Sequence, residues 1–81
     1  MRVRVLLFGP EADALQRSAL DVDAPEACRC SDLRTALAEQ HPGIVPFLRA
    51  GRFAVNCEFA ADDRVLRASD EVALIGLVSG G

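Results

Sequence analysis

The residues best placed for chemistry in this chain are the last two, Gly80 and Gly81, which follow Val78 and Ser79 after an apolar run. Glycine makes up about 7% of average proteins, so a terminal pair arises by chance in roughly one chain in two hundred. Without Cβ atoms the pair forms the thinnest possible peptide, which can enter a narrow channel and present its carboxylate to another protein's active site. The pair therefore predicts a C-terminus that inserts into the active site of another protein. The alternative is a frayed end, because termini are commonly disordered.

Other groups suited to catalysis or metal binding are few. The three cysteines, Cys28, Cys30 and Cys57, are an odd number, which excludes a complete disulfide framework and is typical of a reducing compartment. A zinc site needs His41 as fourth ligand, but a single residue separates Cys28 from Cys30 and His41 stands in a predicted turn. Cys57 has no His near it in sequence, so we expect a small buried apolar residue. We predict no metal site and no enzyme that acts alone.

Length, composition and charge narrow the class of protein. The 81 residues leave room for one domain, and an apolar share of 51% is enough for a core. The net charge of -3 disfavours a nucleic acid partner, because such proteins concentrate cations on one face. All 9 cationic residues are Arg, so no side-chain amine is available for an isopeptide bond. No run approaches the roughly 20 apolar residues that span a bilayer, and no signal peptide is recognisable, so we expect a cytoplasmic protein without a membrane partner.

Two alternating segments predict a hairpin in the first third of the chain. Residues 2–8 begin with polar and apolar residues in alternation, which is typical of a half-buried strand, and residues 19–24 alternate again. Three apolar residues of the first segment then face a core: Val3, Val5 and Leu7. Leu6 and Phe8 fall on the outer face, where apolar side chains indicate a partner surface. Residues 11–18, in between, are weakly patterned and predict a loop or a helical turn.

The remaining pattern predicts one main helix and three more strands. Ser31 is a suitable N-cap for a helix of about ten residues that ends at His41. Residues 44–48 predict a turn packed on the core. Strands are expected at 53–57, briefly at 65–66, and at 71–78, where the apolar run is typical of the middle of a sheet.

This order of elements predicts an α+β fold. With a right-handed crossover, the last strand inserts in parallel beside the first, giving a mixed sheet of four to five strands with the helix across one face. This is the β-grasp (ubiquitin-like) arrangement, and other α+β topologies stay open at this point. We expect the domain to cover residues 1–77 and a flexible tail to cover residues 78–81.

Three segments in chain order carry a resemblance to a known family: residues 53–56 (FAVN), 70–74 (DEVAL) and 78–81 (VSGG). They resemble the "AVN…(G)DEVA…PPVSGG" signature of the molybdopterin synthase small subunit, a ubiquitin-like sulfur carrier, and residues 5–9 and the total length also fit. Ser69 replaces the usual glycine, and Gly76-Leu77 replaces the usual Pro-Pro. Because proline fixes φ, its loss predicts a less stiff approach to the tail.

The resemblance implies a specific reaction at Gly81. A ubiquitin-activating-like adenylyltransferase consumes ATP to adenylate the Gly81 carboxylate, and sulfur that originates from a donor protein converts it to a thiocarboxylate. The tail then enters the large catalytic subunit of molybdopterin synthase and sulfurates cyclic pyranopterin monophosphate in molybdenum cofactor biosynthesis. The implied assembly is a heterotetramer of two small and two large subunits, and no cofactor is permanently bound. The small subunit contributes the sulfur donor and is not catalytic by itself.

The resemblance also assigns a partner interface to Phe8, Phe59 and Ile75, with a core position as the alternative for all three. Several acidic residues in the C-terminal half either steer a basic partner or are solvated turn residues: Glu58, Asp62, Asp63, Asp70 and Glu71. Two other functions stay open. One is a sulfur carrier for thiazole (thiamine), cysteine or tRNA thiolation. The other is a ubiquitin-like interaction module that never reacts.

Overall fold

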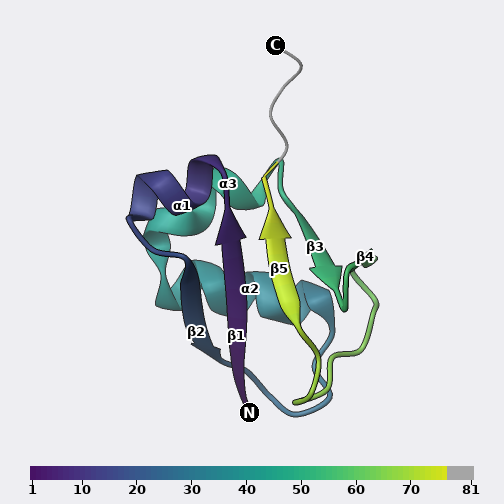
Figure 1. Cartoon of the computed structure of the whole chain (residues 1–81). Coiled ribbons are helices and arrows are strands. Elements are labelled where there is room, and N and C mark those ends of the chain that lie inside the picture. The colour runs from purple at the N-terminus through teal and green to yellow at the C-terminus, as the bar shows by residue number, and fades with distance from the viewer. Residues whose placement is uncertain (77–81) are drawn as a thin grey trace.

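The computed structural model describes residues 1–76, which form a five-stranded mixed sheet with the main helix packed on one face (Figure 1). The strands are β1 (Arg2–Phe8), β2 (Ala19–Asp23), β3 (Arg52–Val55), β4 (Glu58–Phe59) and β5 (Val72–Ile75). The helices are α1 (Pro10–Leu15), α2 (Cys30–Gln40), the 3-10 turn η1 (Pro42–Ile44) and α3 (Val45–Leu48). This is the β-grasp fold that the order of elements predicts.

The last strand occupies the centre of the sheet. The spatial order is β2-β1-β5-β3-β4, and β5 runs parallel to β1 and antiparallel to β3. The register aligns buried residues across the strands, with Val5 opposite both Leu20 and Val72. A slip of one residue would turn these side chains to the other face, so the apolar alternation specifies the register.

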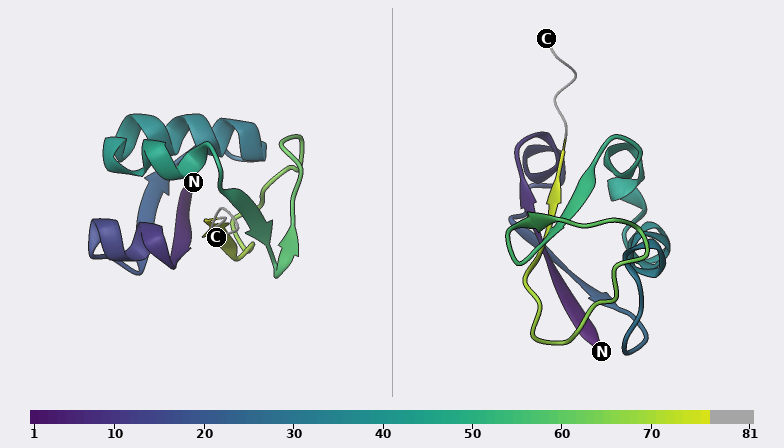
Figure 2. Two further views of the ribbon diagram at one scale, coloured as in Figure 1. Left: turned by 90° about the horizontal axis from the view of Figure 1, so that it is seen from above. Right: turned by 90° about the vertical axis from the view of Figure 1, so that its right-hand side faces the viewer.

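The core lies between the sheet and the layer formed by α2 and α3, which Figure 2 shows on the same side of the strands. Leu33 and Leu37 of α2 are fully buried against this face of the sheet, as the helical spacing predicts. Ile44 and Leu48, from the turn predicted at 44–48, close the same core. Burial of such side chains contributes about 1.5–3 kcal/mol each, so this layer provides most of the stability.

The N-terminus of α2 differs from the prediction, because Ser31 is not the N-cap. The helix begins at Cys30, and Arg29 is the extended cap residue, whose N–H donates to the Asp32 carboxylate at 2.9 Å. The N–H groups of Cys30 and Ser31 donate to the carbonyls of Arg64 and Asp62, each at 2.9 Å. The loop around residues 62–64 therefore satisfies the first two N–H groups of the helix.

The predicted short strand at residues 65–66 is also wrong. Val65 forms only an isolated bridge with Arg29, while the sheet edge is β4. The chain reverses at Asn56 and Cys57, whose φ angles of 52° and 69° are both positive, as in a tight hairpin turn. Leu66 is instead a buried anchor for the loop, and its N–H donates to the Cys28 carbonyl at 2.7 Å.

Two further elements, the segment at residues 11–18 and the last strand, are compared with the prediction here by their type and their extent. The weakly patterned residues 11–18 contain most of α1, so the helical alternative is the observed one. The last strand was predicted over residues 71–78, and β5 covers Val72–Ile75 and is followed by Gly76. The predicted domain boundary at residue 77 and the predicted tail at 78–81 lie outside the described residues.

Candidate functional site

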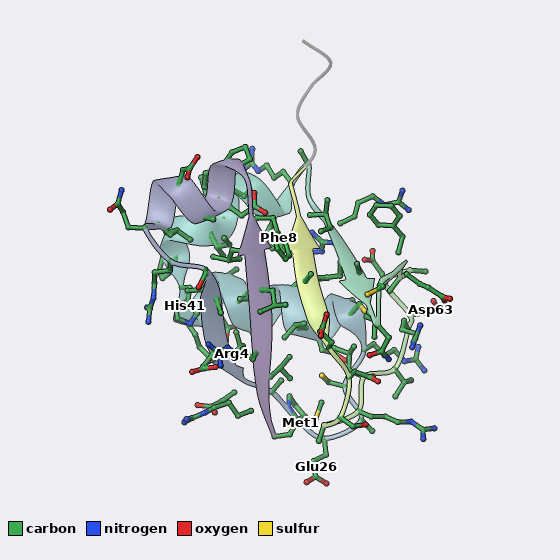
Figure 3. The ribbon with its side chains drawn as sticks, in the orientation of Figure 1. Met1, Arg4, Phe8, Glu26, His41 and Asp63 are labelled. Carbon is green, nitrogen blue, oxygen red and sulfur yellow. The ribbon has the colours of Figure 1, made fainter. Side chains whose placement is uncertain are left out.

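The sheet face opposite α2 is uncovered and carries apolar side chains. On β1 this face holds the exposed residues Arg4 and Phe8 (Figure 3). Phe8 lies opposite Ile75 of β5, and Phe59 of β4 lies opposite Ala54 of β3. Phe8 is 53% exposed and Phe59 is 59% exposed, while Ile75 is half-buried. The alternation of β1 thus places Phe8 outside the core, as predicted.

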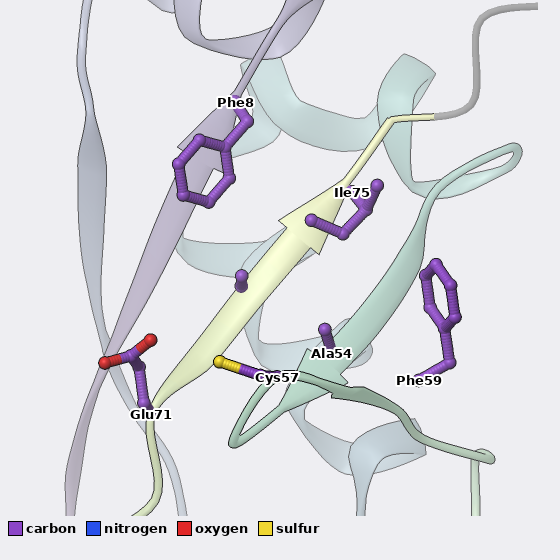
Figure 4. Close-up of a pocket in the computed structure, with 7 residues that line it drawn as sticks. Phe8, Ala54, Cys57, Phe59, Glu71 and Ile75 are labelled. Atoms are coloured by element: carbon purple, nitrogen blue, oxygen red, sulfur yellow. The ribbon is translucent and has the colours of Figure 1, made fainter.

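These residues surround a hollow of about 310 Å³ (Figure 4). Its lining is Phe8, Ala54, Cys57, Phe59, Glu71, Ala73 and Ile75. The shape follows from side-chain size, because Ala54 and Ala73 are paired on adjacent strands and leave a low floor between the two aromatic rings. The Arg52 guanidinium lies 5.1 Å from the centre of the Phe59 ring, a cation–π contact that orients this wall. The result is an apolar depression bordered by an aromatic ring on either side.

The structure brings together all three residues that the sequence resemblance assigned to a partner interface. Phe8, Phe59 and Ile75 come from three different strands and line one hollow. The alternative of a core position is wrong for Phe8 and Phe59, because both are more than half exposed. Their role in binding a partner stays a prediction.

Cys57 lines the hollow, and the sequence analysis did not place it there. We expected a small buried side chain, but Cys57 is exposed, whereas Cys28 and Cys30 are buried. Burial raises the pKa of the Cys28 thiol, with a further contribution from the Asp32 carboxylate, and burial likewise raises the pKa of Cys30. The signal for Cys57 was the preceding Asn56, since asparagine tolerates positive φ and indicates a turn.

A hydrogen-bond network lies at the lower end of the hollow. It is formed by Asn56, Asp70 and Glu71, which belong to the segments that carry the family resemblance. The Asn56 side chain donates to Asp70 Oδ1 and accepts from the Glu71 N–H, both at 3.0 Å. The Asn56 N–H donates to the Glu71 carbonyl at 2.8 Å. Hydrogen bonds from the Arg67 backbone N–H and from Asn56 lower the pKa of the Asp70 carboxyl. This network joins the β3–β4 turn to the start of β5.

The five acidic residues singled out in the sequence have three different environments. Asp70 belongs to the network above, and Asp62 lies 3.7 Å from Arg34 as a surface ion pair. Within residues 1–76, no ion pair forms to Glu58, Asp63 or Glu71. Only Glu71 lines the hollow, so it is the acidic group that a partner seated there would meet.

No three His, Cys, Asp or Glu side chains of residues 1–76 gather as metal ligands. His41, the proposed fourth ligand, has its Nε2 2.9 Å from the Asp21 carbonyl oxygen, while Cys28 and Cys30 are buried and Cys57 borders the hollow. None of the helices within this part of the chain has the length and apolar character needed to cross a membrane.

The point where the chain leaves β5 is held by Glu11, a residue of the weakly patterned segment 11–18 that sequence reasoning missed. Glu11 is 0% exposed, and its Oε1 accepts from the N–H groups of Phe8 at 3.3 Å and Gly76 at 3.2 Å. The reactive terminus expected at Gly81 lies outside the described residues.

Comparisons with known proteins agree on the class of protein. The family model described as the ThiS family matches residues 5–81. The molybdopterin synthase sulfur carrier subunit of Chlamydomonas reinhardtii is 26% identical over 83 residues, with 100% of both chains covered. Among solved structures, SAMP1 of Haloferax volcanii, a small archaeal modifier protein, aligns with a TM-score of 0.81, 26% identity and 100% coverage of both chains.

A second solved structure is a complex. A chain from the complex of subunits 1 and 2 of the molybdopterin-converting factor of Helicobacter pylori aligns with a TM-score of 0.70, 26% identity and 100% coverage of both chains. Two of these relatives carry molybdopterin-related names and the third is named a modifier protein. The relatives therefore share a fold but differ in the role that their names give.

Proposed function

The chain belongs to the ThiS family of small sulfur carriers, and on this basis we propose that it is the sulfur carrier subunit of a molybdopterin synthase. A carrier of this kind is not a catalyst by itself. The observation that carries the proposal is the uncovered apolar hollow formed by Phe8, Phe59 and Ile75. It supports a body that docks on a larger subunit while a separate group, the C-terminal carboxylate, does the chemistry.

The proposed reaction begins at the Gly81 carboxylate, because a carboxylate is a poor electrophile until it acquires a leaving group. An adenylyltransferase transfers AMP from ATP to the carboxylate and releases pyrophosphate. A sulfur nucleophile at the sulfide oxidation level, derived from a donor protein, attacks the carbonyl carbon, and AMP leaves with the bonding electrons. The product is a thiocarboxylate at Gly81, which is itself a nucleophile toward the pterin precursor.

In the second half of the reaction, the thiocarboxylate sulfur attacks a side-chain carbon of cyclic pyranopterin monophosphate inside the large subunit, and a carbon–oxygen bond at that carbon breaks, so that sulfur replaces oxygen without a change of oxidation state. Water then cleaves the acyl–sulfur bond, which leaves the sulfur on the pterin and returns the Gly81 carboxylate for another cycle. The dithiolene product contains two such sulfur atoms, so two thiocarboxylated tails are used for each product. A heterotetramer of two small and two large subunits fits this requirement.

Docking must come before delivery, and the hollow is suited to it. Exposed aromatic residues around a depression are typical of the residues that contribute most to binding energy when a partner buries them. The Helicobacter pylori factor forms a complex between its subunits 1 and 2, and we propose an equivalent pairing for this chain. Glu71 is the one charged residue in the lining, so the partner must place a cation or a hydrogen-bond donor opposite it.

A second candidate is supported by the similarity to the archaeal modifier protein. The same acyl-adenylate can be attacked by an amine of another protein instead of by sulfur, which gives an amide bond to the carboxyl group of Gly81. This chain has no lysine, so it cannot form such a link between copies of itself through a lysine side chain. Both candidates share the activation step and differ in the nucleophile.

The two candidates separate in one experiment. The chain is incubated with ATP and each adenylyltransferase of its genome, together with either a sulfur donor or a lysine-containing acceptor protein, and intact masses are measured. A product whose mass is the sum of the two proteins less one water identifies amide formation. Exchange of one oxygen for one sulfur identifies a sulfur carrier, and molybdopterin formation after addition of the large subunit and the pterin precursor identifies the pathway. Sulfur gain without molybdopterin indicates thiazole, cysteine or tRNA thiolation. Absence of any adenylate or thiocarboxylate with every enzyme would falsify the proposal and support a non-reacting module.

A further inference from the structure

The carboxylate of Glu11 is the buried charged group of the described chain, and it joins residues that are far apart in sequence. Glu11 lies in the first turn of α1, directly after β1. Its Oε1 accepts hydrogen bonds from the Phe8 N–H, three residues away, and from the Gly76 N–H, 65 residues away. One oxygen atom therefore ties the end of β1 to the end of β5.

The two oxygens of this carboxylate differ in their hydrogen bonding. Glu11 is 0% exposed, and within residues 1–76 its Oε2 has no hydrogen-bond partner and no cation forms an ion pair with the carboxylate. An unsatisfied buried polar atom calls for a specific reason. An apolar residue at position 11 would remove the unpaired oxygen, but it would also leave the N–H groups of Phe8 and Gly76 without this acceptor. The side chain is therefore best explained by the two N–H groups that it pairs.

Gly76 is matched to Glu11 in two ways. A Cβ atom at position 76 would overlap Glu11 Oε2 and lie 3.2 Å from Glu11 Cδ, so any side chain would displace the carboxylate. A proline at this position would have no N–H to donate to Oε1. Since Gly76 does not adopt a positive φ, the glycine serves the close approach to Glu11 rather than an unusual backbone conformation.

We propose that Glu11 is a positioning residue that sets where the C-terminal segment leaves the sheet relative to the docking hollow. The same oxygen holds the backbone of Gly76, the start of that segment, and the backbone of Phe8, whose ring borders the hollow. Gly81 lies five residues beyond Gly76, a reach of at most about 17 Å. The place where the chain leaves Gly76 therefore limits the positions that the reacting atom can reach.

This inference rests on the proposed delivery of sulfur by Gly81, and a matched set of variants tests it. Glu11→Gln keeps an acceptor oxygen for both N–H groups, while Glu11→Leu fills a similar volume without an acceptor. Gly76→Ala leaves Glu11 in place but displaces its carboxylate. Asp13→Leu and Asp13→Asn are the controls, because Asp13 lies exposed on the same helix.

The first measurement uses full-length chains carrying the Gly81 thiocarboxylate, mixed with an excess of the large subunit and the pterin precursor. We expect the single-turnover rate of sulfur transfer to fall about tenfold to hundredfold for Glu11→Leu and Gly76→Ala, because a misplaced reactant loses rate steeply. We expect Glu11→Gln to restore the rate to within about threefold, with the Asp13 variants unchanged. Affinity for the large subunit should change by less than about twofold throughout. A purely structural role would instead lower stability and affinity together with the transfer rate.

The second measurement does not depend on sulfur chemistry. Amide hydrogen exchange of Gly76, followed by NMR on the free chain, should be protected in the unmodified chain and in Glu11→Gln and lose that protection in Glu11→Leu. The inference is overturned if Glu11→Leu keeps the Gly76 amide protected and transfers sulfur at the rate of the unmodified chain. If Glu11→Leu does not fold, the transfer rate of Gly76→Ala is compared with that of the unmodified chain instead. If the unmodified chain forms no molybdopterin, the proposed function fails, and Gly76 exchange alone decides whether Glu11 restrains this segment.

Discussion

Both faces of the sheet carry apolar residues, but these are buried on one face and exposed on the other. Val5 and Leu7 on β1 are buried beneath the helices, while Phe8 on the same strand is more than half exposed. β3 and β4 repeat the contrast, since Phe53 is 1% exposed and Phe59 is 59% exposed. Apolar side chains on one face therefore form the core, whereas those on the other face are exposed and form the proposed docking surface. The difference lies in which face α2 covers.

The covered face also differs from the open face in side-chain size at its centre. Beneath α2, large side chains such as Phe53, Leu33 and Leu37 fill the space between sheet and helix. On the open face the central pair is Ala54 and Ala73, and the large residues stand around it. The first arrangement leaves nothing for a partner to fill, whereas the second leaves a depression. The core and the proposed docking surface thus lie on opposite sides of the same strands.

The largest expected effect comes from a change that touches neither face. Deletion of Gly81, or addition of one residue after it, should abolish sulfur transfer while the unfolding free energy stays within about 0.5 kcal/mol, as for other surface changes. The reactive carboxylate would be lost or misplaced, and both faces would be intact. Sulfur transfer is measured as molybdopterin formed with the large subunit, and denaturant unfolding provides the control. Product formation by either variant would contradict the assignment of the chemistry to Gly81.

Two phenylalanines on opposite faces test the contrast directly. Phe53→Ala should lower the unfolding free energy by about 3–5 kcal/mol, because it leaves a cavity in the core, whereas Phe59→Ala should change it by less than about 1 kcal/mol. Denaturant unfolding of both variants gives the two values. Equal losses would mean that the open face contributes to folding as much as the covered face does.

A charge at the rim of the hollow tests the docking role. Phe8→Asp should weaken association with the large subunit by at least about 2 kcal/mol, since an aromatic anchor is lost and a charge must be desolvated. Phe8→Leu serves as the apolar control and should lose less. Isothermal titration against the large subunit measures both. Unchanged affinity for Phe8→Asp would remove Phe8 from the interface.

The cysteines allow the two faces to be compared without mutation. Iodoacetamide at neutral pH should alkylate the exposed Cys57 while Cys28 and Cys30 stay unmodified, because both are buried and burial raises their pKa values. Addition of the large subunit should then protect Cys57, which lines the hollow. Peptide mass mapping over time checks both statements. Modification of Cys57 at the same rate in the complex would place the partner elsewhere.

The smallest effect concerns the network at the lower end of the hollow. The folded-state pKa of Asp70 lies below its ordinary value of 3.8, so its ionised form stabilises the fold above that pH, and this contribution is lost as pH falls through the lower folded-state value. The stability difference between the unmodified chain and Asp70→Asn should be constant near neutral pH and shrink below about pH 4. Thermal unfolding across this range measures it. A difference that does not vary with pH would show that the charge of Asp70 is unimportant.

Much of the fold was predictable because it depends on local patterns. The alternation along residues 2–8 identified which side chains of β1 point outward, including Phe8, and the spacing of Leu33 and Leu37 identified the buried side of α2. Both patterns involve residues only a few positions apart, so they do not depend on how distant segments meet. The strand predicted at residues 65–66 failed because Val65 and Leu66 are too few to distinguish a strand from a loop that buries one apolar residue.

The site was only partly predictable for a similar reason. Family resemblance placed Phe8, Phe59 and Ile75 together, whereas Cys57 and Glu11 were missed, because each depends on contacts that no local pattern reports. The position of Cys57 follows from two consecutive positive φ angles in a turn. Glu11 is polar, and polar residues in a short segment are ordinarily solvated, so its burial had no sequence signal.

The sequence by itself determined the order of the elements, the outward and inward sides of β1 and α2, and the presence of a terminal glycine pair, since these are properties of neighbouring residues. Only the tertiary structure decided that two alanines meet beneath two aromatic rings and that Glu11 holds Gly76. The physical reason is distance along the chain. Residues 11 and 76 become neighbours only when β5 inserts beside β1, and the burial of the carboxylate is a consequence of that pairing.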